Sequence, residues 1–190
     1  GDADMTAVKA AKVKWNPLGT LEKDKILIPA TSVKGALRHR VTYHYNKLNG
    51  YTIGGTKGEP FDAEHCPATR EIFGWNDGNS LVPGCIMLED IIDDETEHKL
   101  VNHVSIDRFT GGAIDGALFT EQIDYAKGRK FCLDIFVTKT ALSTGDYTQL
   151  AFETALKDIC KGLLPLGGGV NRGNGIFHGK LIKDESVIYE

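Results

Sequence analysis

The chain has few cysteines and no long apolar segment, and both absences narrow the possible classes of protein. Its four cysteines are scattered along the chain, and no two of them form a CxxC pair. Neither a disulfide framework nor a zinc ribbon is therefore indicated, and reduced cysteines in an intracellular protein are expected. No apolar run approaches the length of a membrane span and no signal peptide is visible, so we expect no membrane partner.

An excess of positive charge is also absent. The 190 residues include 22 Lys and Arg against 26 Asp and Glu, for a net charge of -4. Any binding of nucleic acid must therefore use a local basic patch. The length and the 41% hydrophobic content fit a single domain over residues 1–190 with sizeable insertions. The acidic start "GDAD", with no apolar strand before it, favours a piece of a longer polypeptide.

Hydrophobic periodicity predicts two helices. The first begins at Thr31 and Ser32 and ends at Gly50, with apolar residues at helical spacing between them. The second covers residues 146–164, has its own apolar face, and takes Asp146 as its N-cap.

Short apolar runs predict three strands, at residues 85–91, 130–138 and 175–183. With the two helices, the order lacks only a leading strand for the β-α-β-β-α-β, ferredoxin-like arrangement, so the predicted fold class is α+β. We expect the leading strand to precede residue 1 or to be formed poorly by residues 7–15. Residues 50–83 and 92–128 show no sustained period and are predicted to be insertions, the first irregular and the second containing a hairpin.

The stretch "LLPLGGGVNRGNGIF", residues 163–177, places five glycines around one arginine. Glycines allow positive φ and close approach of the backbone to a ligand, and successive N–H groups can bind an anion. An arginine adds a bidentate donor for phosphate. The alternative is a flexible connection between a helix and a strand. We predict a phosphate site that contains Gly167, Gly168, Gly169, Asn171 and Arg172.

Two further segments have the chemistry of nucleic-acid contacts. Lys34 and Arg38 share a helix face, His39 follows, and the N-terminus of the helix attracts anions. The segment "HVSIDRFTGGAIDGALF" places Arg108 and Phe109 among glycines, as suits a flexible hairpin that stacks on bases. The alternatives are a solvated basic face and an excursion whose phenylalanines pack onto the domain.

The three motifs "IPATSVKGALRHR", "HVSIDRFTGGAIDGALF" and "LGGGVNRGNG" together resemble the repeat-associated RAMP superfamily. More narrowly, they resemble the backbone subunits of type III CRISPR effector complexes. The resemblance implies guide-RNA contacts at Lys34, Gly35 and Arg38 and along the glycine loop. It also implies a thumb hairpin at residues 105–119, which displaces a nucleotide and divides the guide–target duplex.

Active members of this family cleave target RNA beside the displaced nucleotide. The resemblance implies an acidic residue after the first strand and a divalent metal, here Mg²⁺. In "GDAD", Asp4 is the first candidate and Asp2 the second, to orient or activate the ribose 2′-hydroxyl or to hold the metal. The alternative is a solvated acidic stretch in a non-catalytic backbone scaffold.

Other residues leave further alternatives open. A guide-RNA-processing endoribonuclease could use His39 and His44 as general acid and base. A regulator could bind a small ligand through the glycine loop alone.

Zinc is a further candidate cofactor. His65 and Cys66 lie where some relatives carry a zinc knuckle, and Cys85, His44 or His98 would have to complete four ligands. The expected partners are guide RNA, target RNA and neighbouring copies or other subunits of an antiviral effector in the prokaryotic cytoplasm.

Overall fold

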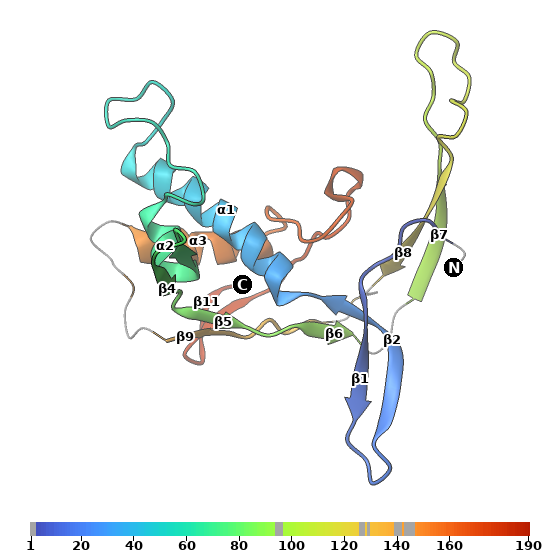
Figure 1. Ribbon diagram of the computed structural model, residues 1–190, viewed down its shortest axis with the longest axis horizontal. Coiled ribbons are helices and arrows are strands. Elements are labelled where there is room, and N and C mark those ends of the chain that lie inside the picture. The colour runs from blue at the N-terminus through green and yellow to red at the C-terminus, as the bar shows by residue number, and fades with distance from the viewer. Residues whose placement is uncertain (1–2, 94–96, 126–127, 129, 139–141, 143–146) are drawn as a thin grey trace. The chain divides into compact units, whose positions relative to one another are not determined.

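The computed structural model describes residues 3–93, 97–125, 128, 130–138, 142 and 147–190 (Figure 1). These residues form three α-helices, a short 3-10 helix and antiparallel strand pairs, so the α+β class is confirmed. The chain divides into two compact units. Unit 1 is Gly1–Ile28 with Asp90–Leu133, and unit 2 is Pro29–Glu89 with Asp134–Glu190. No helix in the described part of the chain is long and apolar enough to cross a membrane.

The core of unit 2 is formed where two helices pack together. Helix α1, Ala30–Asn49, begins after Pro29 and ends at Gly50, whose φ of 76° lies in the left-handed region. Both bounds confirm the prediction, although no side chain caps the N-terminus. The buried face of α1 packs against α3, Thr148–Cys160, as Figure 1 shows. Fully buried residues of the two helices are Val33, Leu37, Val41, Ala151 and Ala155.

Helix α3 is shorter than predicted at its C-terminal end. Gly162 follows it with a φ of 72°, and the N–H groups of Leu163 and Leu164 bond to the carbonyl oxygen of Asp158. A left-handed glycine at this position ends a helix. The predicted N-cap, Asp146, lies outside the described residues, and Tyr147 occupies the N-cap position.

Residues 67–83 are more regular than predicted. Helix α2, Pro67–Phe73, leads into a hairpin of β3, Gly74–Asn76, and β4, Leu81–Pro83. The prediction of an irregular insertion is therefore wrong for this part. Such short elements show too few turns or alternations for a period to be recognised in the sequence.

The other strands of unit 2 are short. β5, Ile86–Leu88, pairs antiparallel with β9, Ile135–Val137, inside the two segments predicted as strands. β10, Leu181–Lys183, pairs with β11, Ser186–Tyr189, so the predicted final strand is only partly formed.

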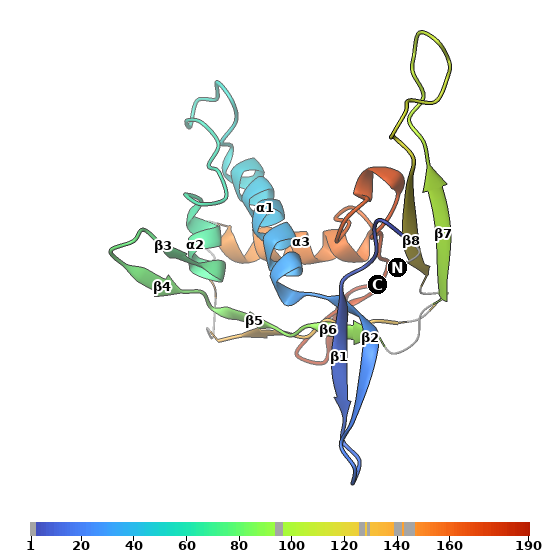
Figure 2. The same ribbon diagram turned by 45° about the vertical axis from the view of Figure 1, so that its right-hand side comes forward.

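Unit 1 contains a three-stranded sheet in the order β1-β2-β6. β1, Lys9–Lys14, lies within the segment expected to form a poor strand, and β2, Thr20–Ile28, ends directly before α1. β6, Ile91–Asp93, pairs with the end of β2. β1 and β2 form a hairpin, visible in Figure 2, with Trp15 93% exposed in its turn.

Unit 1 also contains a second hairpin. β7, Glu97–His103, pairs with β8, Phe119–Tyr125, over their full length. Residues 92–128 are therefore more regular than their sequence suggested, because paired strands extend on both sides of the hairpin segment expected at residues 105–119. β7 is largely exposed on both faces, so its sequence has no alternation of apolar and polar residues. The described strands form five small sheets, and the ferredoxin-like order stays a prediction.

Candidate functional site

The glycine loop is folded into a defined turn. The N–H of Leu166 donates to the carbonyl oxygen of Gly175 at 2.9 Å and closes the loop. Inside it, the N–H groups of Arg172 and Asn174 donate to the carbonyl oxygen of Gly169 at 2.8 and 3.3 Å, around the 3-10 helix η1, Val170–Arg172. These bonds do not fit the alternative of a flexible connection.

Two of the loop glycines are required by close packing. A Cβ on Gly175 would overlap the carbonyl oxygen of Leu166, and one on Gly169 would lie 2.6 Å from Nδ2 of Asn174. Gly167 and Gly168 are exposed, and nothing lies within 4 Å of the Cβ position of either. A ligand can therefore approach the backbone closely at these two residues.

The polar residues of the loop face solvent. Asn171 and Arg172 are both exposed on η1. A guanidinium beside exposed backbone N–H groups can bind a phosphate oxygen at two points. The predicted members of this site therefore lie together on one exposed loop.

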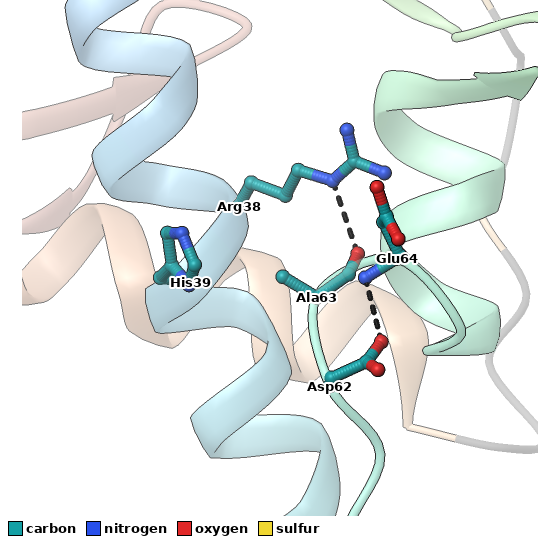
Figure 3. A pocket seen from close by; sticks show the side chains of 5 residues that line it. All are labelled: Arg38, His39, Asp62, Ala63 and Glu64. Carbon is teal, nitrogen blue, oxygen red and sulfur yellow. Dashed lines mark hydrogen bonds between the residues drawn. The ribbon is translucent and has the colours of Figure 1, made fainter.

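Arg38 reaches from α1 to the segment that follows the helix. Its Nε donates to the carbonyl oxygen of Ala63 at 3.0 Å, as Figure 3 shows. The side chain is partly buried, whereas Gly35 and His39 are exposed and Lys34 is half-buried. An open pocket of about 430 Å³ lies here, lined by Arg38, His39, Asp62, Ala63 and Glu64.

The charge of this pocket is mixed. Asp62 accepts hydrogen bonds from the backbone N–H of His65 and from its ring Nδ1, which hold the pKa of the Asp62 carboxyl below its ordinary value. Asp62 and Glu64 thus place carboxylates beside the guanidinium of Arg38. The pocket is less suited to a phosphate than the sequence predicted, and Lys34 and the start of α1 are the better donors.

His44, a candidate general acid or base for guide processing, is buried against another helix. It is 8% exposed, and its Nε2 lies 2.7 Å from Oδ2 of Asp158 on α3. Arg40 binds the same oxygen at 2.5 Å. Burial would raise the pKa of the Asp158 carboxyl, but the hydrogen bonds from His44 and Arg40 outweigh it and lower that pKa. His44 therefore joins two helices, which does not favour a role in guide processing.

The zinc candidates do not form a ligand set. Cys66 is fully buried, and Nδ1 of His65 already lies 2.8 Å from Asp62. Among the residues that the structure describes, no group of three or more His, Cys, Asp or Glu side chains could hold a metal ion. Two residues alone do not supply the four ligands that structural zinc takes.

Asp107 organises the tip of the β7–β8 hairpin. Its Oδ1 accepts the N–H groups of Phe109 and Thr110 at 2.7 and 2.9 Å. The bonds from Thr110 and Phe109 lower the pKa of the Asp107 carboxyl. Sequence reasoning missed this residue, although an aspartate ahead of a glycine-rich turn is a usual signal for such a turn.

The folded tip presents two predicted contact residues. Arg108 is exposed and Phe109 is 99% exposed. The alternative that the phenylalanines pack onto the domain is therefore wrong for Phe109. Phe119, in the last strand pair before the tip loop, instead stacks on His103 with the ring centroids 4.8 Å apart.

Asp4 lies beside the same hairpin, at the end of β8 where the strands meet the tip loop. Its N–H donates to the carbonyl oxygen of Thr120, and its Oδ2 accepts the N–H of Thr120, both at 2.8 Å. Met5 forms a bridge to Glu121, so this segment lies along the edge of β8. Asp4 is exposed, and Asp2 lies outside the described residues.

A histidine and a glutamate lie close to this position and were not predicted. Nε2 of His103 is 3.0 Å from Oε2 of Glu121 across the two strands. Glu121 is 7% exposed. The pair depends on the register of β7 and β8, so no sequence signal could have found it.

A comparison with protein families identifies the family of this chain. A protein-family model, the RAMP superfamily, matches residues 19–178. Because the match covers most of the chain, the chain belongs to the RAMP superfamily. Membership indicates a CRISPR-associated, RNA-binding role. Among curated proteins, none matches this chain.

Proposed function

We propose that this chain is a backbone subunit or domain of a type III CRISPR effector. It binds guide RNA, positions the guide–target duplex, and cleaves target RNA beside a displaced nucleotide. The main support is that Asp4 is hydrogen-bonded to β8 next to the tip loop of a hairpin, and this tip presents Arg108 and Phe109. Nucleotide displacement and cleavage must occur close together, and this hairpin has candidates for both.

Guide binding uses phosphate contacts in this proposal. Arg172 and the exposed backbone at Gly167 and Gly168 bind phosphate oxygens, and Lys34 with the start of α1 provides a second site. Phosphate contacts do not depend on the base, so guide affinity is sequence-tolerant and falls with salt. Base pairing between guide and target supplies the specificity.

The hairpin tip acts on the duplex. Phe109 is an exposed aromatic side chain on a turn organised by Asp107, as a wedge or stacking residue requires. Stacking of a base on an aromatic ring contributes about 1–3 kcal/mol. That energy offsets part of the cost of removing one nucleotide from the duplex.

Asp4 is the proposed catalytic carboxylate. Its carboxylate orients the ribose 2′-hydroxyl for attack on the adjacent phosphate. Mg²⁺ is usually held by one or two carboxylates together with substrate phosphates, so an exposed single carboxylate such as Asp4 fits it. When bound there, Mg²⁺ would stabilise negative charge on the phosphate.

The test separates catalysis from scaffolding. Asp4→Asn keeps an oxygen acceptor for the N–H of Thr120 but removes the charge. We expect target-RNA cleavage to fall at least about 100-fold, with guide RNA still bound. Undiminished cleavage in both Asp4→Asn and Asp2→Asn would refute this assignment of the site. A purified protein with no bound RNA would favour the small-ligand alternative.

A further inference from the structure

We propose that His103 is a general base for this cleavage and that Glu121 positions it. The inference rests on the proposed function and adds a second catalytic residue to Asp4. It starts from a pair of side chains at the end of β7 and β8 where the strands meet the tip loop, a pair that the proposed roles of Asp4 and Phe109 leave unused.

The pair is held rigidly. Nε2 of His103 and Oε2 of Glu121 are 3.0 Å apart, and the rings of His103 and Phe119 stack at 21°. The side chain of Glu121 is 9% exposed, whereas that of His103 is 25% exposed. The carboxylate is thus covered, and one part of the imidazole reaches solvent.

This geometry selects a tautomer. An ionised carboxylate only accepts hydrogen bonds, so Nε2 of His103 donates to Glu121 and carries the ring proton. Nδ1 then has a lone pair and can take a proton. The same division of roles occurs between the aspartate and histidine of serine hydrolases.

Asp4 and His103 lie on opposite sides of β8. The backbone N–H and carbonyl of Thr120 both bond to Asp4, whereas Thr120 pairs in register with Asn102 of β7. Adjacent strands are about 4.8 Å apart, so the backbones of Asp4 and His103 are separated by roughly 10 Å. For both side chains to reach one ribose and its phosphate, the RNA strand has to cross the face of β8 between them.

The chemical step balances without a further reactant. Nδ1 of His103 takes the proton of the 2′-hydroxyl as O2′ bonds to phosphorus and the bond from phosphorus to the 5′-oxygen breaks. The leaving 5′-oxygen takes a proton from water, and the imidazolium returns its proton to the hydroxide that remains. The products are a 2′,3′-cyclic phosphate and a 5′-hydroxyl end.

The experiment uses the intact protein loaded with guide RNA, under single-turnover conditions with matched target RNA. We expect His103→Ala to slow cleavage by about 10²- to 10⁴-fold with target binding unchanged, and added imidazole to restore part of the rate. Glu121→Gln should give a smaller loss, in kcat and not in KM. His98→Ala, on the same exposed strand, is the matched control and should cleave normally.

Each other result overturns the proposal. Normal cleavage by His103→Ala refutes the catalytic role of His103. It leaves the proposed function standing, because the protein still cleaves target RNA. A loss that imidazole does not restore, together with weaker RNA binding or a lower Tm, assigns His103 a structural role. An unaltered protein that does not cleave RNA refutes both proposals.

Discussion

Asp158 is predicted to stabilise the helical core of unit 2, because it joins α3 to two residues of α1. Its side chain is 6% exposed and receives hydrogen bonds from Arg40 at 2.5 Å and His44 at 2.7 Å. Asp158→Ala leaves both donors without this acceptor. Breaking a buried ion pair costs about 3–5 kcal/mol, and the partial exposure of Arg40 places the expected loss near about 3 kcal/mol.

The assay is equilibrium unfolding in urea, followed by helical circular dichroism. Asp158→Asn keeps one oxygen acceptor and should lose only about 1–2 kcal/mol. The control is Glu153→Ala on the same helix, whose ion pair with Lys183 lies near the surface and should contribute at most about 1 kcal/mol. If Asp158→Ala were as stable as the control, the buried pair would not stabilise the core and the reasoning would fail.

The remaining predictions concern pH, the glycine loop and the hairpin tip. In the folded state the pKa of the Asp158 carboxyl lies below its ordinary value of 3.8, so the ionised carboxylate stabilises the fold above pH 3.8 and this stabilisation is lost as the pH falls further. An acid titration of Tm should show this loss in the unaltered protein and not in Asp158→Asn. Arg172→Ala should weaken guide binding and reduce the salt slope by about one phosphate contact, and an unchanged slope would contradict the phosphate role. Gly175→Ala should disrupt the loop and lower Tm, because the added Cβ would overlap the carbonyl oxygen of Leu166. An unchanged Tm would contradict this prediction. Phe109→Ala should weaken displacement of the nucleotide without a change in Tm, as measured by the fluorescence of 2-aminopurine in the target. Equal fluorescence in the variant and the unaltered protein would argue against a wedge.

The helical core and the exposed turn positions of Phe109 and Arg172 were accessible from sequence for one reason. Helix α1 buries one face, so Val33, Leu37 and Val41 recur at helical spacing, and Gly50 marks its end. Phe109 and Arg172 lie among glycines, a pattern that signals turns. In each case the information lies within a few residues of the position concerned.

The extent of the β7–β8 hairpin was not accessible in this way, although a hairpin was expected at residues 105–119. β7 is largely exposed and β8 is mostly half-buried, so no alternation distinguishes these strands from a loop. Asp107, by contrast, bonds to N–H groups only two and three residues further on, and its place ahead of a glycine-rich turn is a local signal that was missed. The mixed charge beside Arg38 depends on a segment more than twenty residues away that folds back onto α1.

The sequence by itself determined the family, the two main helices and the types of residue available for RNA contacts, because local spacing and composition specify them. Only the tertiary structure decided which of these residues meet. It brought Asp4 to Thr120 and His103 to Glu121, and it buried His44 against Asp158. The physical reason is that strand register and helix packing join residues distant in the chain, and hydrogen bonds between such residues have no local pattern.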